Sequence, residues 1–322
     1  MTIPNDLRAA VAAALLTTVA AGSLAAQTVS RTGGAGAPVL QLVTAPRAAA
    51  LGGALAAADG AEGALVNPAA VAGVTRYGAH GSLQTLYDGS RAGSAALAYR
   101  FPLVAVGLTA RYLDEGSIDE VVCDGCGGRG TATGKSLDAQ ETAIGAMAAV
   151  RLPLGFAVGA GVTSYASTVA ADKGNAIAFS AGAHFAPLPF ASLGASISNV
   201  GGDATVGGFA GKLPREIRVG AEVKPLYLLN SPVSATIAAD VVNTDGGSTY
   251  VAGGLEVGAT APVSGVGVFG RVGMVSDHDV NFGSSGPRFG GGLRFRGVSV
   301  DYAYQSSDIF GGMHRVGLTV RR

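Results

Sequence analysis

The sequence predicts an all-β protein: an antiparallel transmembrane β-barrel of about fourteen strands, preceded by a short helical hatch or plug. Nearly everything after Tyr77 alternates apolar and polar residues with a period of two, which is typical of strands. No apolar run after Ala26 is long enough for a membrane-spanning helix. Glycine supplies 51 of the 322 residues without a three-residue period, and 48% of residues are hydrophobic, which argues against collagen-like and disordered chains.

The first residues have the features of a secretory signal peptide. Arg8 precedes an Ala/Leu/Val run over residues 9–21, and small residues follow at 23–26. We therefore expect residues 1–26 to be a signal peptide and residues 27–38, rich in Gly, Thr and Ala, to be a flexible leader.

Residues 39–74 are apolar and helix-prone, and we expect them to form an N-terminal hatch. The Ala-rich stretch 47–58 predicts a helix that is too short to cross a bilayer. Gly52 and Gly53 in its middle each cost about 1 kcal/mol relative to Ala, and they indicate a bend or a close backbone contact. The stretch is therefore either a surface helix with a tight turn or a segment packed inside the space that the strands enclose.

A second helical turn is predicted directly afterwards. Asn67 is placed to cap a helix start with its side-chain oxygen, and Pro68 suits the first helical position because its missing N–H is not needed there. Gly73 suits the left-handed conformation that often ends a helix. Residues 67–73 should form a single capped turn.

Period-two segments fill the region 75–322, and their length of about ten residues is that of a tilted strand crossing a bilayer. They lie at residues 76–86, 91–101, 103–113, 139–151, 154–167, 176–186, 189–199, 214–224, 233–243, 248–259, 264–275, 287–296, 297–305 and 312–321.

Each strand has one apolar face and one face of small, polar or charged residues. In the segment 103–113, Val106 and Leu108 alternate with Gly107 and Thr109. A soluble sandwich or barrel with apolar residues inside produces this pattern, and so does an outer-membrane barrel with apolar residues facing lipid. Short, Pro-bearing connections alternate with longer Gly/Asp-rich ones, which favours the outer-membrane barrel.

A barrel of about fourteen strands encloses more space than its own side chains fill, so the hatch is the expected plug. Charges on the inward faces should pair with one another or with hatch residues before they serve a substrate. The inward charges are Arg100, Arg111, Arg218, Glu222, Asp240, Arg294, Asp301 and Arg315, and the hatch charges are Arg47, Asp59 and Glu62.

Several short motifs stand out between about Val39 and the C-terminus. They are the hatch residues Arg47, Gly52, Gly53, Asp59, Asn67 and Pro68, and the closing stretches Val300-Asp-Tyr-Ala-Tyr and Gly311-Gly-Met-His-Arg-Val-Gly-Leu. Together they resemble the PorV/PorQ family of outer-membrane proteins, which are similar to FadL-type barrels. The resemblance implies a fourteen-stranded barrel with an N-terminal hatch and a role in type IX secretion, in which the protein binds secreted cargo and works with other secretion components. The likeness to FadL implies the alternative, a channel for hydrophobic small molecules.

The only two cysteines, Cys123 and Cys126, stand in the longest predicted connection. A structural zinc site of this type needs four thiolates, so we expect a local disulfide in an exported protein.

No enzymatic activity and no cofactor are expected. The four histidines are scattered, no nucleophile-elbow motif is present, and Asp277-His278-Asp279 is better explained as a solvated turn than as a metal site. With 22 basic and 22 acidic residues, the chain lacks the basic excess of a nucleic-acid-binding protein. Outer-membrane lipid is the expected environment.

Overall fold

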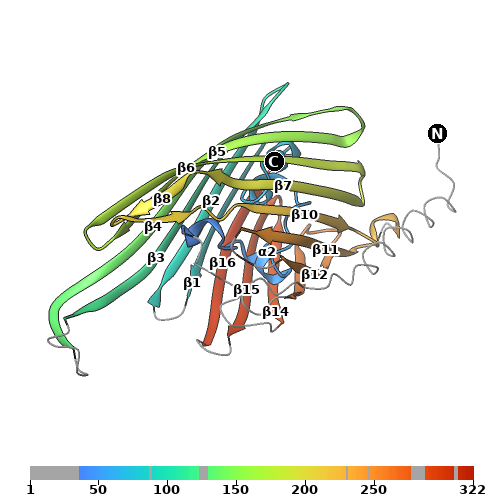
Figure 1. Ribbon diagram of the computed structural model, residues 1–322. Helices are drawn as coiled ribbons and strands as arrows, with labels where there is room; N and C mark the ends of the chain where they lie inside the picture. Colours follow the sequence, from blue (N-terminus) through green and yellow to red (C-terminus); the bar gives the residue numbers. More distant parts are fainter. Residues whose placement is uncertain are drawn as a thin grey trace. The chain divides into compact units, whose positions relative to one another are not determined.

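The computed structural model describes residues 36–322 except 87–88, 123–129, 230, 246, 248, 277–286 and 308–310. Cys123 and Cys126, the predicted signal peptide (residues 1–26) and the turn predicted at residues 277–279 lie outside the described residues. Within the described part, fourteen antiparallel strands form a closed barrel, as predicted (Figure 1). Each strand pairs with its neighbour along the chain, β7 pairs with β10, and β1 pairs with β16 to close the barrel.

The fourteen predicted segments all correspond to barrel strands. These are β1 (Tyr77–Thr85), β2 (Arg91–Arg100), β3 (Ala105–Val122), β4 (Thr131–Arg151), β5 (Phe156–Val169), β6 (Asp172–Leu188), β7 (Ala191–Gly201), β10 (Glu216–Val223), β11 (Val233–Thr244), β12 (Thr249–Thr260), β13 (Gly267–Val275), β14 (Arg288–Phe295), β15 (Val298–Ser307) and β16 (Gly311–Arg321). A separate hairpin, β8 (Asp203–Val206) with β9 (Phe209–Lys212), stands in the connection between β7 and β10.

The connection predicted between residues 114 and 138 is mostly paired strand instead of loop. β3 and β4 continue their ladder to the pair Val122↔Thr131, with irregularities after Asp114 and Asp119 (Figure 1). The β4 part of this extension is exposed on both faces, so it has no apolar alternation to reveal it. Backbone hydrogen bonds extend the hairpin because they do not depend on side-chain type.

The apolar faces of the strands point outward. In β13, Val268, Val272 and Met274 are 56%, 41% and 64% exposed, whereas Phe269 and Arg271 are buried. The interpretation as a soluble protein with an apolar interior is therefore wrong, and the interpretation as a membrane barrel is confirmed. None of the helices among the described residues is long and apolar enough to cross a membrane.

The two ends of the barrel differ. We call the end that carries the connections 101–104, 152–155, 189–190 and 296–297 the turn end, and the opposite end, which carries the β8–β9 hairpin, the loop end. Short turns of outer-membrane barrels face the periplasm, so the turn end is the periplasmic one. Two short 3₁₀ helices, η4 (Pro153–Gly155) and η5 (Tyr227–Leu229), lie in its connections.

The hatch, residues 39–74, packs against the inner face of the barrel. It contains α2 (Pro46–Ala50), α3 (Gly60–Gly63) and η2 (Pro68–Gly73), and the turn η1 (Pro38–Leu40) begins one residue before it. One apolar cluster joins hatch residues such as Leu55 to alanines of β2, β3, β4 and β5. A second cluster at the loop end joins Val39 and Leu40 to Tyr165 and Leu213. The hatch is therefore a plug inside the barrel and not a surface helix.

Candidate functional site: the hatch inside the barrel

The inner wall beneath the hatch is built largely from glycine. A Cβ at Gly194 would collide with the carbonyl oxygen of Ala56, and one at Gly182 would collide with the side chain of Asn67. Without these side chains, the hatch backbone lies directly against the strands. The same close approach recurs at Gly107, Gly159, Gly254, Gly273, Gly290 and Gly317.

Gly52 and Gly53 end α2 and turn the chain. The helix is shorter than the predicted 47–58, because Gly52 and Gly53 adopt φ angles of 77° and 99°, which other residues rarely adopt. A Cβ at Gly52 would also collide with the carbonyl oxygen of Met274 in β13. The Gly pair thus provides both features expected of it, a bend and a close backbone contact.

Arg47 joins the hatch to two carboxylates of the wall. Its Nη2 lies 3.3 Å from Oε2 of Glu222 in β10, and its Nε lies 3.1 Å from Oε2 of Glu256 in β12. Glu256 also pairs with Arg271 at 2.5 Å. Burial alone would lower the pKa of the Arg47 guanidinium, but the charges of Glu256, Glu222 and Glu62 outweigh it and raise that pKa. Arg47 therefore stays charged.

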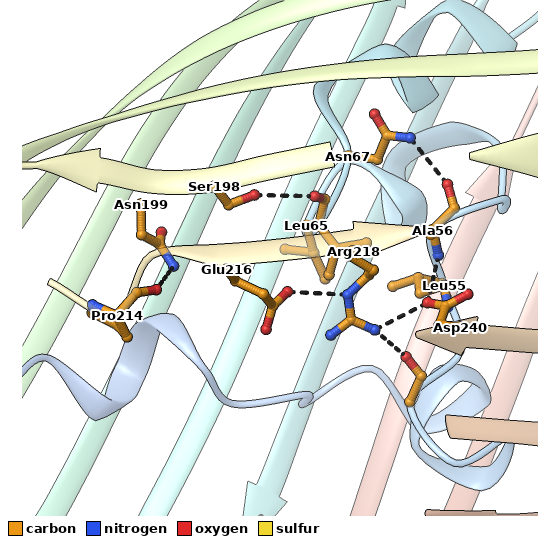
Figure 2. A network of polar contacts seen from close by, with 12 residues as sticks. Leu55, Ala56, Leu65, Asn67, Ser198, Asn199, Pro214, Glu216, Arg218 and Asp240 are labelled. Atoms are coloured by element: carbon orange, nitrogen blue, oxygen red, sulfur yellow. Dashed lines mark hydrogen bonds and ion pairs between the residues drawn. The ribbon is translucent and has the colours of Figure 1, made fainter. Parts of the chain in front are cut away.

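A second anchor surrounds Arg218 and Asp240, which are both 2% exposed (Figure 2). Nη1 of Arg218 donates to Oδ2 of Asp240 at 3.0 Å and to the carbonyl oxygen of Gly53 at 2.8 Å. Oδ2 of Asp240 in turn accepts from the backbone N–H groups of Leu55 and Ala56 at 2.8 and 2.9 Å. Arg218 and Asp240 thus hold the hatch backbone that follows the Gly52–Gly53 turn. They bond backbone groups there that make no hydrogen bond to the rest of the hatch backbone.

Asn67 caps η2 as predicted. Its Oδ1 accepts from the backbone N–H of Ala69 at 3.0 Å, and Pro68 occupies the first helical position. Its Nδ2 donates to the carbonyl oxygen of Ala56 at 3.0 Å (Figure 2) and to that of Ala183 at 3.1 Å. This single side chain ties three segments together.

Asp59 and Gly73 form a close contact at the turn end. Gly73 does not adopt the predicted left-handed conformation. A Cβ there would stand 2.7 Å from the Cβ of Asp59, so close approach explains this glycine better. Oδ1 of Asp59 lies 3.5 Å from Nε2 of His184, and its side chain is half-exposed.

Cavities lie beside the hatch at both the turn end and deeper in the barrel. One of about 460 Å³ lies at the turn end among Arg47, Glu222, Arg294 and Arg321. Another of about 350 Å³ lies at the same end beside Asp59. The third, of about 50 Å³, lies deeper, between residues 40–45 and the rest of the hatch. The hatch thus leaves the lumen open at the turn end and nearly closed further in.

The barrel wall is irregular beside the deep cavity. The pairing of β6 with β7 shifts register between Phe179 and Ala181, and Asn199 in β7 has a φ of 61°. Its Nδ2 donates to the carbonyl oxygen of Pro214 at 3.1 Å, outside the strand ladder (Figure 2). Ser180, Ser198 and Asn199 all line the cavity, so this bulge forms part of the wall between the cavity and the outer surface.

Among the inward charges, Arg218, Glu222, Asp240 and Asp301 form ion pairs with the wall or the hatch, as expected. Arg111 instead donates to the hatch carbonyl oxygens of Leu40 and Leu65, and Arg315 donates to the amide oxygens of Gln84 and Gln305, so the ion pair expected for Arg315 is not found among the described residues. Glu256 and Arg271 were missing from the expected set, although their inward positions in strongly alternating strands were the signal that pointed to them. Within the described residues, no group of three or more potential metal ligands is present.

No protein-family model matches the sequence, and no curated protein matches it either. Several solved barrels are similar in fold. The toluene transporter TbuX of Ralstonia pickettii has a TM-score of 0.58 and 13% identity, over 86% of this chain and 96% of that one. The toluene transporter TodX of Pseudomonas putida has a TM-score of 0.56 and 8% identity, over 85% and 96%. A FadL homologue of Pseudomonas aeruginosa has a TM-score of 0.51 and 11% identity, over 86% and 98%.

The closed barrel, its apolar outer face and its internal hatch define an outer-membrane β-barrel protein. Within that class, the fold is similar to FadL-type barrels. None of the comparisons supports the PorV/PorQ resemblance, so that finer assignment stays a prediction. The similar structures named above are transporters or transporter homologues and not enzymes.

Proposed function

We propose that this protein is a channel through which hydrophobic small molecules cross the outer membrane. The observation that carries the proposal is the plugged barrel itself, because toluene transporters have the same fold. The deep cavity adds support, since Leu40, Leu42, Val43 and Leu55 line it together with polar groups such as Arg111 and Glu216.

The plug must move for a molecule to pass, because the deep cavity holds only about 50 Å³. Residues 39–45 are the segment most easily displaced. Among the described residues, three side-chain bonds hold them: the N–H of Val39 donates to Glu141 at 2.9 Å, Oγ1 of Thr44 donates to Oγ of Ser94 at 2.6 Å, and Nη1 of Arg111 donates to the carbonyl oxygen of Leu40 at 2.5 Å. The rest of the hatch has the anchors at Arg47 and Asp240.

The β6–β7 bulge marks the route by which a transported molecule would leave the barrel. Once residues 39–45 withdraw, the cavity widens towards Asn199, where the strand ladder is already interrupted. A hydrophobic molecule leaving there enters the membrane without crossing the charged turn end.

A disulfide lock tests the proposal. Thr44→Cys with Ser94→Cys, made with Cys123 and Cys126 replaced by Ser, brings two sulfurs together where the two hydroxyl oxygens are 2.6 Å apart. The matched control is Ser82→Cys with Ser94→Cys, because these hydroxyls are 2.9 Å apart and both belong to the wall.

Uptake of radiolabelled toluene is measured in cells that express the protein and lack another transporter of this fold. We expect the hatch lock to reduce uptake to the level of cells without the protein, and a reductant to restore it. The wall lock should have no effect. If cells with the unmodified protein take up toluene no faster than cells without it, the proposal is wrong.

The secretion role stays a prediction, and a deletion in the barrel tests it. Deleting residues 114–138 at the loop end should abolish surface delivery of cargo if the protein is a secretion component. The same deletion should leave toluene uptake intact if it is a channel.

A further inference from the structure

Two buried arginines lie against the hatch in the wall formed by β14, β15 and β16. Arg288 and Arg315 are each 6% exposed. Both line a cavity of about 60 Å³ that residues 41–43, Gly53 and Gln305 also line. Two guanidinium groups therefore share one small space between the hatch and the wall.

Among the described residues, the polar side chains that share this cavity with the arginines are uncharged, and they include Tyr250 and Gln305. Nε of Arg315 donates to Oε1 of Gln84 at 2.8 Å, and its Nη2 donates to Oε1 of Gln305 at 3.1 Å. Nη1 of Arg315 and Nε of Arg288 have no hydrogen-bond partner within the described residues. Amide oxygens accept hydrogen bonds but bring no negative charge, so these two bonds leave the charge of Arg315 without a counter-charge.

The nearby carboxylates of the lumen are engaged with other arginines. In the described part of the chain, no acidic side chain forms an ion pair with Arg288 or Arg315. The ion pairs that occupy the wall carboxylates are Arg47–Glu222, Arg47–Glu256, Arg218–Asp240 and Arg271–Asp301. A buried charge without a partner is strongly unfavourable, so the cavity between these two arginines is a favourable place for an anion.

We propose that Arg288 and Arg315 bind a small inorganic anion, a halide or phosphate, in this cavity. A water needs about 15 Å³ by the same measure, so the cavity accepts an anion of that size and excludes a hydrocarbon chain. Unbonded N–H groups of both guanidiniums supply the donors. The anion holds the hatch turn to the wall, since a Cβ at Gly53 would stand only 4.0 Å from Nη1 of Arg288. This site is independent of the transported molecule.

Bromide locates the site directly. Crystals of the full-length protein soaked in sodium bromide should give an anomalous peak between the two guanidiniums, and Arg315→Gln should remove it. If a carboxylate from elsewhere in the chain already neutralised the arginines, the unmodified protein would give no peak there. That result would overturn the proposal.

Thermal unfolding in detergent gives the second measurement, at constant ionic strength, with bromide, phosphate or gluconate. Bromide or phosphate should raise the unfolding temperature to a plateau, whereas gluconate, too large for the cavity, should not. Arg288→Gln and Arg315→Gln should each raise the half-saturating concentration at least tenfold.

Arg294→Gln is the matched control. Arg294 also points into the lumen, but its guanidinium lies 4.4 Å from the centre of the Phe269 ring and outside this cavity. It should keep the response of the unmodified protein. An equal loss of the response in Arg294→Gln, or equal unfolding temperatures in all three salts, would contradict the site. If a glutamine variant does not fold, the presence or absence of the bromide peak in the unmodified protein is the test of the site.

Discussion

Arg47 is the hatch residue whose removal should loosen the plug most. Arg47→Met keeps the length of the side chain and removes the charge that faces Glu222 and Glu256. Breaking a buried ion pair by removing one partner costs about 3–5 kcal/mol. In this variant Glu256 still pairs with Arg271, and Glu222 still pairs with Lys224 at 3.2 Å. The lower limit of that cost therefore applies. A cost of about 3 kcal/mol increases the population of the displaced hatch on the order of 100-fold.

Hydrogen exchange of the hatch amides measures this population. The N–H groups of Leu55 and Ala56 are suitable reporters, because they bond to Asp240 and not to the mutated residue. Their exchange should accelerate on the order of 100-fold in Arg47→Met and much less in Arg47→Lys, which keeps the charge. Adding Glu222→Gln and Glu256→Gln to Arg47→Met should recover most of the protection. Unchanged exchange in Arg47→Met would show that the ion pairs do not hold the hatch.

Three further substitutions test the hatch contacts and the membrane face. Asn67→Ala removes the cap of η2 and two further hydrogen bonds, and a loss of about 1–3 kcal/mol should appear as faster proteolysis of the hatch in an otherwise intact barrel. Gly194→Val should displace the hatch backbone at Ala56 and raise single-channel conductance in planar bilayers, whereas a conductance equal to that of the unmodified protein would mean that the hatch accommodates the side chain. Leu108→Arg places a charge on the lipid face and should cost about 2–4 kcal/mol, which urea unfolding in lipid vesicles measures; Leu108→Met, which keeps the side chain apolar, is the control that should cost less.

The barrel strands were predictable because their signal is local. A period of two records which side of each strand meets lipid, and each strand repeats it independently of the others. The cap at Asn67 and Pro68 was predictable for the same reason, since the residues that make it adjoin in the sequence. The extension of β3 and β4 was missed because, beyond the apolar band, both faces meet water and the alternation disappears.

The sequence by itself therefore determined the fold class, the strands and the segment that becomes the plug. Only the tertiary structure decided which wall residues hold that plug. Arg47 and Glu256 stand 209 positions apart, and Leu55 and Asp240 stand 185 apart. No local pattern records such a pairing, because it depends on the register of each strand, on closure between β1 and β16, and on the depth at which the hatch settles. The register of β14 and β16 on β15 likewise brings Arg288 and Arg315 to one cavity, which neither strand reveals alone.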